Sequence, residues 1–311
     1  MTCEVLFTMR YCLMPLLLFH ISIAWAENAV PTDRYFFSGD GSIHLINAHT
    51  NKSARVRYRL SDGTYPVEAR QQINRLFGVP AGSNDHIALR LISVLDYIED
   101  RYQQPIEIIS GYRSPEYNES LRAKGRLAAK TSMHIEGMAA DIRMRKVLST
   151  EWFQVLKKLQ CCGVGYYHDN SLHVDTGPVR YWDETTSKVR TNISAHNKQV
   201  IVRTDLDMYL PGETVELRLA RITDYPIGLA SGFAVVQEGQ EPRAFFFDGK
   251  EETCLPIKGP LQRTVQWTVP EGFHAEGRVQ LRLRLCDRSF PEMPEHIESN
   301  PIQVLRAPSG Q

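Results

Sequence analysis

Residues 132–143 read SMHIEGMAADIR, and residues 163–177 read GVGYYHDNSLHVDTG. Side chains alternate between the two faces of a β-strand, so residues two positions apart share a face. The strand in the first stretch therefore places Asp141 opposite its apolar neighbours. The strand in the second stretch places His173 and Asp175 together on its polar face. We expect two adjacent strands that present Asp141 and His173 side by side.

A further histidine, His134, lies just before the first of these strands, on a loop that Gly137 allows to turn sharply. Two imidazoles and one carboxylate, with a fourth position left to water, form the ligand set of a hydrolytic Zn²⁺ site. Such a metal lowers the pKa of its bound water and polarises the scissile carbonyl. The spacing alone leaves a structural role for these side chains open, because His and Asp at this separation also occur by chance.

The order of the surrounding motifs is more specific than the spacing. The region resembles the zinc D-Ala-D-Ala peptidase and hedgehog superfamily in the pattern Ser132-x-His134-x-x-Gly137-x-Ala139-x-Asp141, followed by His173-x-Asp175. It is similar to the YcbK-like branch, the periplasmic murein peptidases, in the segments SGYRS (110–114), GVGYY (163–167) and GPVRYW (177–182). The resemblance covers roughly Tyr35–Trp182, including NAHT (47–50).

The resemblance implies a mixed zinc-peptidase domain in which His134, Asp141 and His173 bind zinc. Asp175 would support this set, since an aspartate two residues from a ligand on the same strand face can orient an imidazole N–H. Glu136 follows His134 by two positions, but the H-E-x-x-H helix pattern is absent, so we do not assign Glu136 as a general base.

The resemblance also implies catalytic roles, for which the candidates are Arg113, Asp169 and Asp175. Arg113 would lie near the substrate carbonyl or a peptide carboxylate, where a guanidinium stabilises developing negative charge; a surface arginine in a turn is the alternative. Several enzymes of the superfamily carry a Glu or Asp general base three residues before the last His ligand. Here that position is Asn170, which cannot accept a proton, and neither Asp169, His168 nor Asp175 has the expected spacing.

The N-terminus carries the signature of a secretory signal peptide. Arg10 precedes the largely apolar residues 11–23, and the small-x-small sequence Ala24-Trp25-Ala26 follows them. The apolar run is shorter than the ~20 residues that span a membrane. We predict that residues 1–26 are cleaved and that the mature chain is exported to the periplasm, with retention as a membrane anchor as the alternative.

The composition limits the class of partner and the number of domains. The chain has 311 residues, and its 36 Lys and Arg balance its 36 Asp and Glu. Because counterion release needs a basic surface, this balance argues against nucleic acid or anionic lipid as the main partner. At roughly 150 residues per domain, the length predicts two domains. We place a zinc peptidase-like domain at 33–184, a linker at 185–197 and a β-sandwich domain at 198–307.

The periodicity of the first domain mixes strands with helices, which predicts an α+β fold. The expected elements are a strand pair at 42–47 and 54–60, a strand at 106–109, and helices at 87–102, 115–124 and from 149 or 150 to about 159. Asn84 and Asp85 are capping candidates for the helix at 87–102. Cys161 and Cys162 are predicted to be buried thiols at the end of the last helix.

From about Asn197 the pattern is all-β. The expected strands are 199–203, 213–221, 232–237, 243–247, 264–268, 278–286 and 302–306. Short strands of this kind between Pro and Gly turns predict an immunoglobulin-like sandwich. In an exported domain Cys254 and Cys286 form a disulfide or remain separate, and the sequence leaves both open.

Together these features predict an exported zinc metallopeptidase that hydrolyses peptide bonds in peptidoglycan stems or cross-links. The alternative is a catalytically degenerate module that binds murein peptide while its β-domain recruits a protein partner. A purely structural zinc site is a third interpretation. Zinc content measured together with turnover distinguishes the first two, and unfolding of the first domain on removal of the metal would favour the third.

Overall fold

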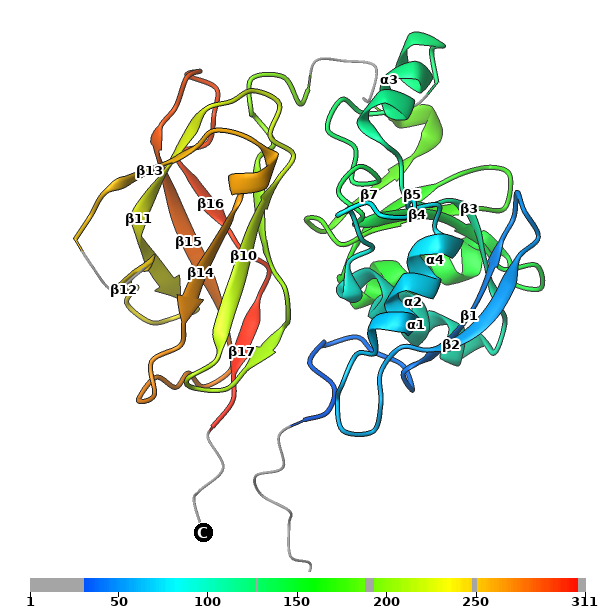
Figure 1. Ribbon diagram of the computed structural model, residues 1–311, viewed down its shortest axis with the longest axis horizontal. Helices are drawn as coiled ribbons and strands as arrows, with labels where there is room; N and C mark the ends of the chain where they lie inside the picture. The colour runs from blue at the N-terminus through cyan, green and yellow to red at the C-terminus, as the bar shows by residue number, and fades with distance from the viewer. Residues whose placement is uncertain (1–30, 127, 188–192, 248–250, 307–311) are drawn as a thin grey trace, which may run out of the picture.

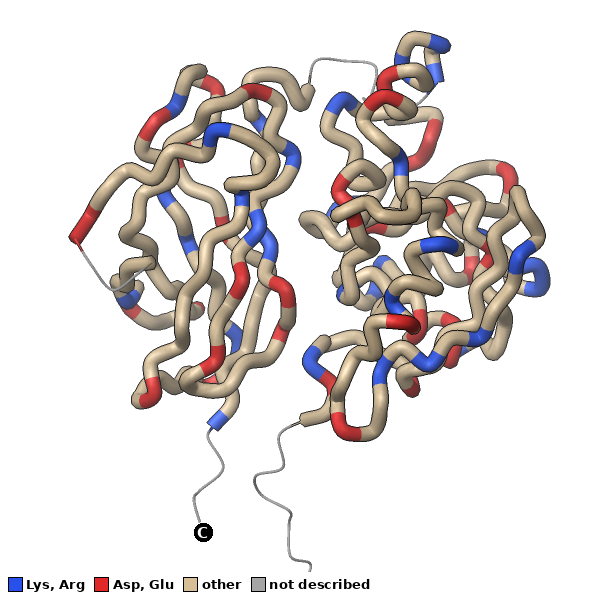
Figure 2. The backbone as a smooth tube through the Cα atoms, in the orientation of Figure 1, with Lys and Arg blue, Asp and Glu red and all other residues tan. Residues whose placement is uncertain are grey.

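The computed structural model describes residues 31–126, 128–187, 193–247 and 251–306, which form two bodies side by side (Figure 1). The α/β half (residues 31–187) encloses one hydrophobic core, which includes Ile43, Trp152 and Val174. The β half (residues 193–306) encloses a second core. Charged residues of both signs are spread over both halves, in keeping with the zero net charge (Figure 2). The predicted signal peptide lies outside the described residues.

The α/β half is built on a mixed sheet in the strand order β2-β1-β3-β4-β6-β5-β7. Its neighbouring strands are antiparallel except for the parallel pairs β1–β3 and β5–β7. The strands are β1 (Ser42–Asn47), β2 (Ser53–Arg57), β3 (Ile106–Ser110), β4 (Ala139–Arg143), β5 (Gly163–Tyr166), β6 (Leu172–Asp175) and β7 (Arg180–Asp183). Because alternate side chains face opposite ways, the apolar residues of β4 and β6 enter the core while Asp141 and His173 project from the other face.

Of the four helices in the described part of this half, three contribute apolar residues to the core on one face of the sheet, whereas the third along the chain buries only Asn118. The helices are α1 (Val67–Leu76), α2 (Leu89–Tyr102), α3 (Pro115–Ala123) and α4 (Ser149–Leu159), and a 3₁₀ turn, η1 (Glu184–Thr186), follows β7. Of these, α1 was not expected, because only Ile73 and Leu76 of its ten residues are buried and its sequence lacks a clear apolar stripe. No helix of the described residues combines the length and apolar character that crossing a membrane requires.

The starts of the helices differ in how they are capped. Ser114 caps α3 by accepting a hydrogen bond from the Tyr117 backbone, with Pro115 in the first turn as expected. The prediction that Asn84 or Asp85 caps α2 is wrong, because the helix begins only at Leu89 and Ala88 occupies the N-cap without a side-chain bond. The Ile87 backbone N–H instead donates to the side chain of Asn74, which holds the chain before the helix.

A buried carboxylate on α2 makes the stability of the α/β half sensitive to pH. Asp96 is fully buried, and its Oδ2 accepts hydrogen bonds from Tyr58 at 2.8 Å and from the Gly41 backbone at 2.9 Å. Burial raises the pKa of Asp96 to about 7, with a further contribution from the nearby charges of Asp100 and Asp40.

Asp96 therefore favours the folded state when it is protonated. The pKa of Asp96 in the folded protein lies above the unfolded value of about 4. Its contribution to stability is therefore complete below about pH 4 and is lost as the pH rises through about 7. The free energy of unfolding falls by up to about 4 kcal/mol over this range. We expect Asp96→Asn to gain stability relative to the parent protein between pH 5 and 8, measured by urea unfolding at each pH. A constant difference between the two proteins over this range would contradict the prediction.

The β half consists of two sheets around its core. One has the strand order β14-β10-β8, and the other follows the path β12-β11-β15-β17-β9, with β13 paired to β11 and β16 to β15. The strands are β8 (Ile201–Thr204), β9 (Met208–Tyr209), β10 (Thr214–Ala220), β11 (Ile227–Val236), β12 (Arg243–Phe246), β13 (Cys254–Ile257), β14 (Thr264–Thr268), β15 (Arg278–Asp287), β16 (His296–Glu298) and β17 (Ile302–Val304). Every expected strand has a counterpart, whereas the short β9, β13 and β16 were missed.

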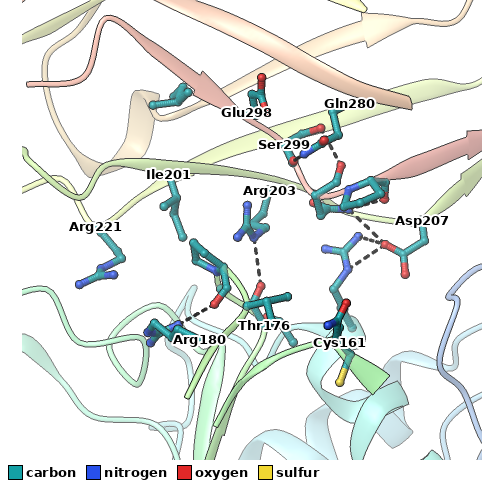
Figure 3. A pocket seen from close by; sticks show the side chains of 18 of the residues that line it. Cys161, Thr176, Arg180, Ile201, Arg203, Asp207, Arg221, Gln280, Glu298 and Ser299 are labelled. Atoms are coloured by element: carbon teal, nitrogen blue, oxygen red, sulfur yellow. Dashed lines mark hydrogen bonds and ion pairs between the residues drawn. The ribbon is translucent and has the colours of Figure 1, made fainter. Parts of the chain in front are cut away.

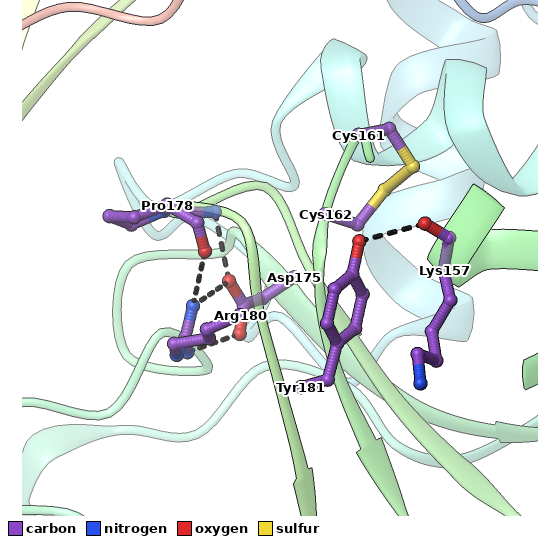
Figure 4. Close-up of a disulfide and its surroundings, with 8 residues drawn as sticks. Lys157, Cys161, Cys162, Asp175, Pro178, Arg180 and Tyr181 are labelled. Carbon is purple, nitrogen blue, oxygen red and sulfur yellow. Dashed lines mark hydrogen bonds and ion pairs between the residues drawn. A yellow bond between two sulfur atoms is a disulfide. The ribbon is translucent and has the colours of Figure 1, made fainter. Parts of the chain in front are cut away.

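The cysteines pair in two ways. Cys254 on β13 and Cys286 on β15 form a disulfide, which joins two strands that both flank β11. The prediction of two buried thiols at Cys161 and Cys162 is wrong, because these adjacent residues are bonded to each other (Figure 4). They lie where α4 gives way to β5, just after Gln160 has turned the chain in a left-handed conformation.

The two halves share an interface that involves both α2 and the loop before β4. Arg90 on α2 donates to Asp207 at 2.7 Å, and the apolar side chains Met133, Met138 and Ala139 pack with Ile201 and Ala220 of the β half. Glu136, in the loop before β4, pairs with Arg218 at 3.2 Å and with Arg263 at 2.8 Å. The loop that carries His134 is therefore in direct contact with the β half.

Candidate metal centre

The pairing of β4 with β6 brings two of the predicted ligands together. In this antiparallel ladder Asp141 lies directly opposite His173, and Ala139 lies opposite Asp175. Directly opposed residues of an antiparallel pair have neighbouring side chains on the same face. The sequence prediction of Asp141 and His173 side by side on adjacent strands is thus confirmed.

His134 reaches the same point from the loop before β4. Gly137 lies in the left-handed region, with φ of 66°, and a side chain there would collide with the backbone oxygen of His86. Only glycine fits this close approach without strain. The turn at Gly137 allows Met138 to return to the Met133 backbone, so His134 lies at the tip of a closed loop.

The three side chains converge with a geometry that suits a metal ion. His134 Nε2 lies 3.2 Å from His173 Nδ1 and 3.4 Å from Asp141 Oδ1, and the latter two atoms are 2.9 Å apart. Ligands about 2.0–2.1 Å from a tetrahedral ion lie about 3.3 Å from one another. All three residues are buried, and their ligand atoms form a group that could hold a metal ion.

The outer hydrogen bonds of the two histidines determine which nitrogens face this point. His134 Nδ1 donates to the Gly111 carbonyl at 2.7 Å, and His173 Nε2 donates to Asp175 Oδ2 at 2.8 Å. In neutral imidazoles the inner nitrogens therefore carry lone pairs. Two lone pairs and a carboxylate oxygen then face each other, an arrangement that a cation stabilises.

The electrostatics of the cluster follow from burial and mutual contact. Burial lowers the pKa of His134. Burial acts in the same direction on His173, but hydrogen bonds to Asp141 and Asp175 outweigh it and raise the pKa of that imidazole. Burial would raise the pKa of Asp141, yet the two histidines hold it well below its usual range. The carboxylate is therefore ionised and available as a ligand.

Asp175 supports His173 from behind the cluster. It is fully buried, and besides His173 it accepts two hydrogen bonds from Arg180, at 2.9 and 2.6 Å (Figure 4). Burial would raise the pKa of Asp175, but the charge of Arg180 and the hydrogen bond from His173 lower it strongly. Its carboxylate orients the imidazole, and its oxygens are occupied by these partners and the Gly177 backbone.

Arg113 contacts the cluster through Asp141. Its Nη2 donates to Asp141 Oδ2 at 2.7 Å and its Nε to Ser110 Oγ at 3.0 Å. The Asp141 carboxylate thus has one oxygen toward the histidines and the other held by Arg113. This guanidinium also lines the cavity described below, so the structure brings Arg113 to the site.

The β5–β6 turn is not brought to the site. Asp169 is exposed, and its carboxylate accepts a hydrogen bond from the Ser171 backbone at 3.1 Å within the turn. Asn170, at the position expected for a general base, has φ of 66° and accepts a hydrogen bond from the Ser149 backbone at the start of α4. Its side chain is therefore used to join the turn to the helix. The exposed His168 contacts Asp183.

A cavity of about 390 Å³ opens over the cluster. His134, His173 and Arg113 line it, together with Tyr167, Trp182 and Glu184, which the sequence analysis did not assign. Tyr167 donates to Asp141 Oδ1 at 3.3 Å, and the Trp182 ring lies 5.1 Å from the His173 ring. The runs GVGYY and GPVRYW drew attention to Tyr167 and Trp182, but only the fold shows that they line this cavity.

Known proteins resemble the α/β half of the chain. The family model described as peptidoglycan L,D-endopeptidase MepK matches residues 38–182. The peptidoglycan L,D-endopeptidase MepK of Escherichia coli (strain K12) is 31% identical over 148 residues, which are 44% of this chain and 78% of that protein. The chain belongs to the MepK family. The probable MepK of Haemophilus influenzae is 46% identical over 78 residues, 25% of this chain and 42% of the relative.

The MepK match contains the whole cluster and ends at Trp182. His134, Asp141, His173, Arg113 and Asp175 all lie within it, and the resemblance to zinc D-Ala-D-Ala peptidases is thereby confirmed for the family. Glu184, two residues beyond the match, is the carboxylate that lines the cavity apart from the cluster. The β half lies entirely outside the family match.

Proposed function

We propose that this protein is an exported zinc metallopeptidase that hydrolyses peptide bonds in peptidoglycan stems or cross-links, as the names of its MepK relatives suggest. The observation that carries the proposal is the convergence of His134, Asp141 and His173 within 2.9–3.4 Å beneath an open cavity. Membership of the MepK family supports the peptidoglycan substrate.

In this proposal His134, Asp141 and His173 hold Zn²⁺, which supplies an activated water and polarises the scissile carbonyl. Arg113 fixes the Asp141 carboxylate and presents its guanidinium to the cavity, where it stabilises negative charge on the substrate. Asp175 fixes the tautomer of His173. Glu184 offers the cavity a carboxylate, which Asn170 cannot supply.

We propose residues 1–26 as a signal peptide for export to the periplasm, and domain bounds of 33–184 and 198–307 with a linker at 185–197. The separate cores of the two halves support this division. We further propose that the C-terminal domain is an immunoglobulin-like sandwich, which its two sheets support.

The test is digestion of purified murein sacculi with the full-length protein, followed by analysis of the released muropeptides. We expect new peptide products with zinc, none after treatment with a chelator, and none from His134→Ala. If the zinc-loaded parent protein releases no products, peptidase activity is rejected.

A second candidate is a binding module that recognises murein peptide without cutting it. The observation that favours it is Asn170, whose side chain contacts α4 at the position where a general base is expected. Stoichiometric zinc and measurable peptide binding without turnover would select this function over the peptidase.

The support of His173 by Asp175 yields a prediction about metal affinity. Asp175→Asn is expected to weaken zinc binding about 10–100-fold, because a neutral amide holds the imidazole N–H less strongly and leaves Arg180 without its charge partner. Competition with a chelating indicator measures the change. Asp183→Asn on β7, whose carboxylate contacts the exposed His168, is the matched control. Equal zinc affinities of the two variants would contradict the role assigned to Asp175.

A further inference from the structure

A second and larger cavity, of about 730 Å³, lies between the two halves (Figure 3). Arg180, Gln199 and Arg221 line both this cavity and the one over the metal cluster. Figure 3 shows Arg221 on the side of the β half and Arg180 on the side of the α/β half. The wall that the two cavities share is therefore built from both halves and carries two guanidinium groups.

Arg221 is held firmly but lacks a charge partner. It directly follows β10, and its backbone N–H donates to Glu136 Oε1 at 3.3 Å, while its Nη2 contacts the side-chain oxygen of Gln199. Its Nε is buried without a hydrogen-bond partner. No carboxylate of the described residues forms an ion pair with this guanidinium. Buried polar groups are normally satisfied, so an unsatisfied N–H beside a cavity is a position for a ligand acceptor.

The charges around Arg221 favour the binding of an anion beside it. Burial, and then the charge of Arg180, lower the pKa of Arg221 to about 10. Arg203 lines the larger cavity, donates only to backbone carbonyls, and has a pKa lowered to about 10 by burial and by the charge of Arg90.

Glu184 lines the smaller cavity and accepts a hydrogen bond from the His168 backbone. The other carboxylates of this region already have charged partners. Asp175 binds Arg180 and His173, and Asp207 binds Arg90. Glu298, which also lines the larger cavity, pairs with Arg282. Positive charge therefore remains at the shared wall.

We propose that Arg221 binds a carboxylate of the peptide substrate beside the metal cluster, so that the β half contributes a specificity residue to the site. This inference rests on the proposed function. A guanidinium matches the geometry of a carboxylate and binds it through two parallel N–H donors. Arg180 adds attraction through its charge, since its own donors are occupied by Asp175. The MepK family match ends at Trp182, so this contact lies outside the part of the chain that matches the family.

The test compares two cross-linked stem peptides that differ in one group, a free carboxylate next to the scissile bond or its amide. For the free carboxylate, Arg221→Gln is expected to raise KM about 10–100-fold with kcat within about twofold, because a hydrogen bond to a charged group is lost. For the amide, KM is expected to be similar in the variant and the parent protein. Arg221→Lys, which keeps the charge without the planar fork, is expected to lie between the two.

The control is Arg306→Gln, which removes the same charge from an exposed position on the β half and is expected to leave KM unchanged. Thermal unfolding and zinc content of each variant show whether it is folded and loaded. If Arg221→Gln does not fold, Arg221→Lys supplies the comparison. An unchanged KM for the free carboxylate in the folded variant, or an equal loss for the amide, would overturn the proposal.

A binding measurement separates this inference from the proposed function. Calorimetric titration of the chelator-treated full chain with the same two peptides requires no cleavage. Binding that prefers the free carboxylate and is lost in Arg221→Gln supports the contact even if the protein proves to hydrolyse nothing. Cleavage by the parent protein without any dependence on Arg221 leaves the peptidase function in place and rejects the contact.

Discussion

Replacing His173 by alanine is expected to abolish stoichiometric zinc binding and to reduce peptide hydrolysis by about 10³-fold or more. The change removes the ligand atom that lies 3.2 Å from His134 Nε2 and 2.9 Å from Asp141 Oδ1, so only two ligands remain. Charge stabilisation by a catalytic metal is worth several kcal/mol, and each 1.4 kcal/mol corresponds to a factor of ten in rate. Metal content by elemental analysis and muropeptide release measure the two effects separately.

The matched control is His168→Ala, which removes an exposed histidine from the neighbouring β5–β6 turn. It is expected to retain full zinc content and activity. Should His173→Ala retain one zinc per chain and normal turnover, the assignment of the metal site would be wrong. A loss of folding without zinc, seen equally in the chelated parent protein, would instead point to a structural metal.

A second large effect, on stability, is expected from replacing Glu136 by alanine, although this residue does not face the metal cluster. Its buried carboxylate lies between Arg218 and Arg263, which belong to β10 and to the turn before β14. Glu136→Ala leaves two largely buried guanidinium groups without their partner, which is expected to cost about 3 kcal/mol or more in the free energy of unfolding. Urea unfolding followed by circular dichroism measures this loss.

Glu119→Ala is the appropriate comparison for Glu136, since it breaks an exposed ion pair with Arg122 on α3. Such surface pairs contribute little, and the expected loss is below about 0.5 kcal/mol. Because Glu136 and His134 share one loop, Glu136→Ala is also expected to weaken zinc binding, whereas Glu119→Ala is not. If both variants were equally stable, the interface at Glu136 would not support the loop.

Much of the α/β half and of its metal cluster follows from local pattern. The alternation of polar and apolar residues in β4 and β6 determines which face carries Asp141 and His173, because a strand has a period of two. Gly137 indicates the tight turn that brings His134 close to Asp141 and His173. In the β half, the alternation along β15 buries Val279, Leu281, Leu283 and Leu285 as a half-buried strand requires.

Local pattern fails where contacts between distant segments set the outcome. The sparse apolar residues of α1 do not reveal a helix, and β9, β13 and β16 are too short to show a period. Cys161 and Cys162 were predicted as separate thiols, whereas the folded chain bonds these adjacent residues to each other. From the sequence, Asn170 stands where a general base is expected but cannot accept a proton. In the structure its contact with the Ser149 backbone gives it a structural role.

The contacts between the two halves around the site could not be predicted from the sequence. Glu136 and Arg221 are separated by many residues, and neither belongs to a motif that predicts its partner. Their contact exists because the loop before β4 and the first residue of β4 pack against β8 and β10 of the β half. Strand periodicity thus specifies Asp141 and His173, and the turn at Gly137 brings His134 to them. The burial of charges between the two halves specifies what surrounds these side chains, since a buried charge requires a partner that only the folded chain supplies.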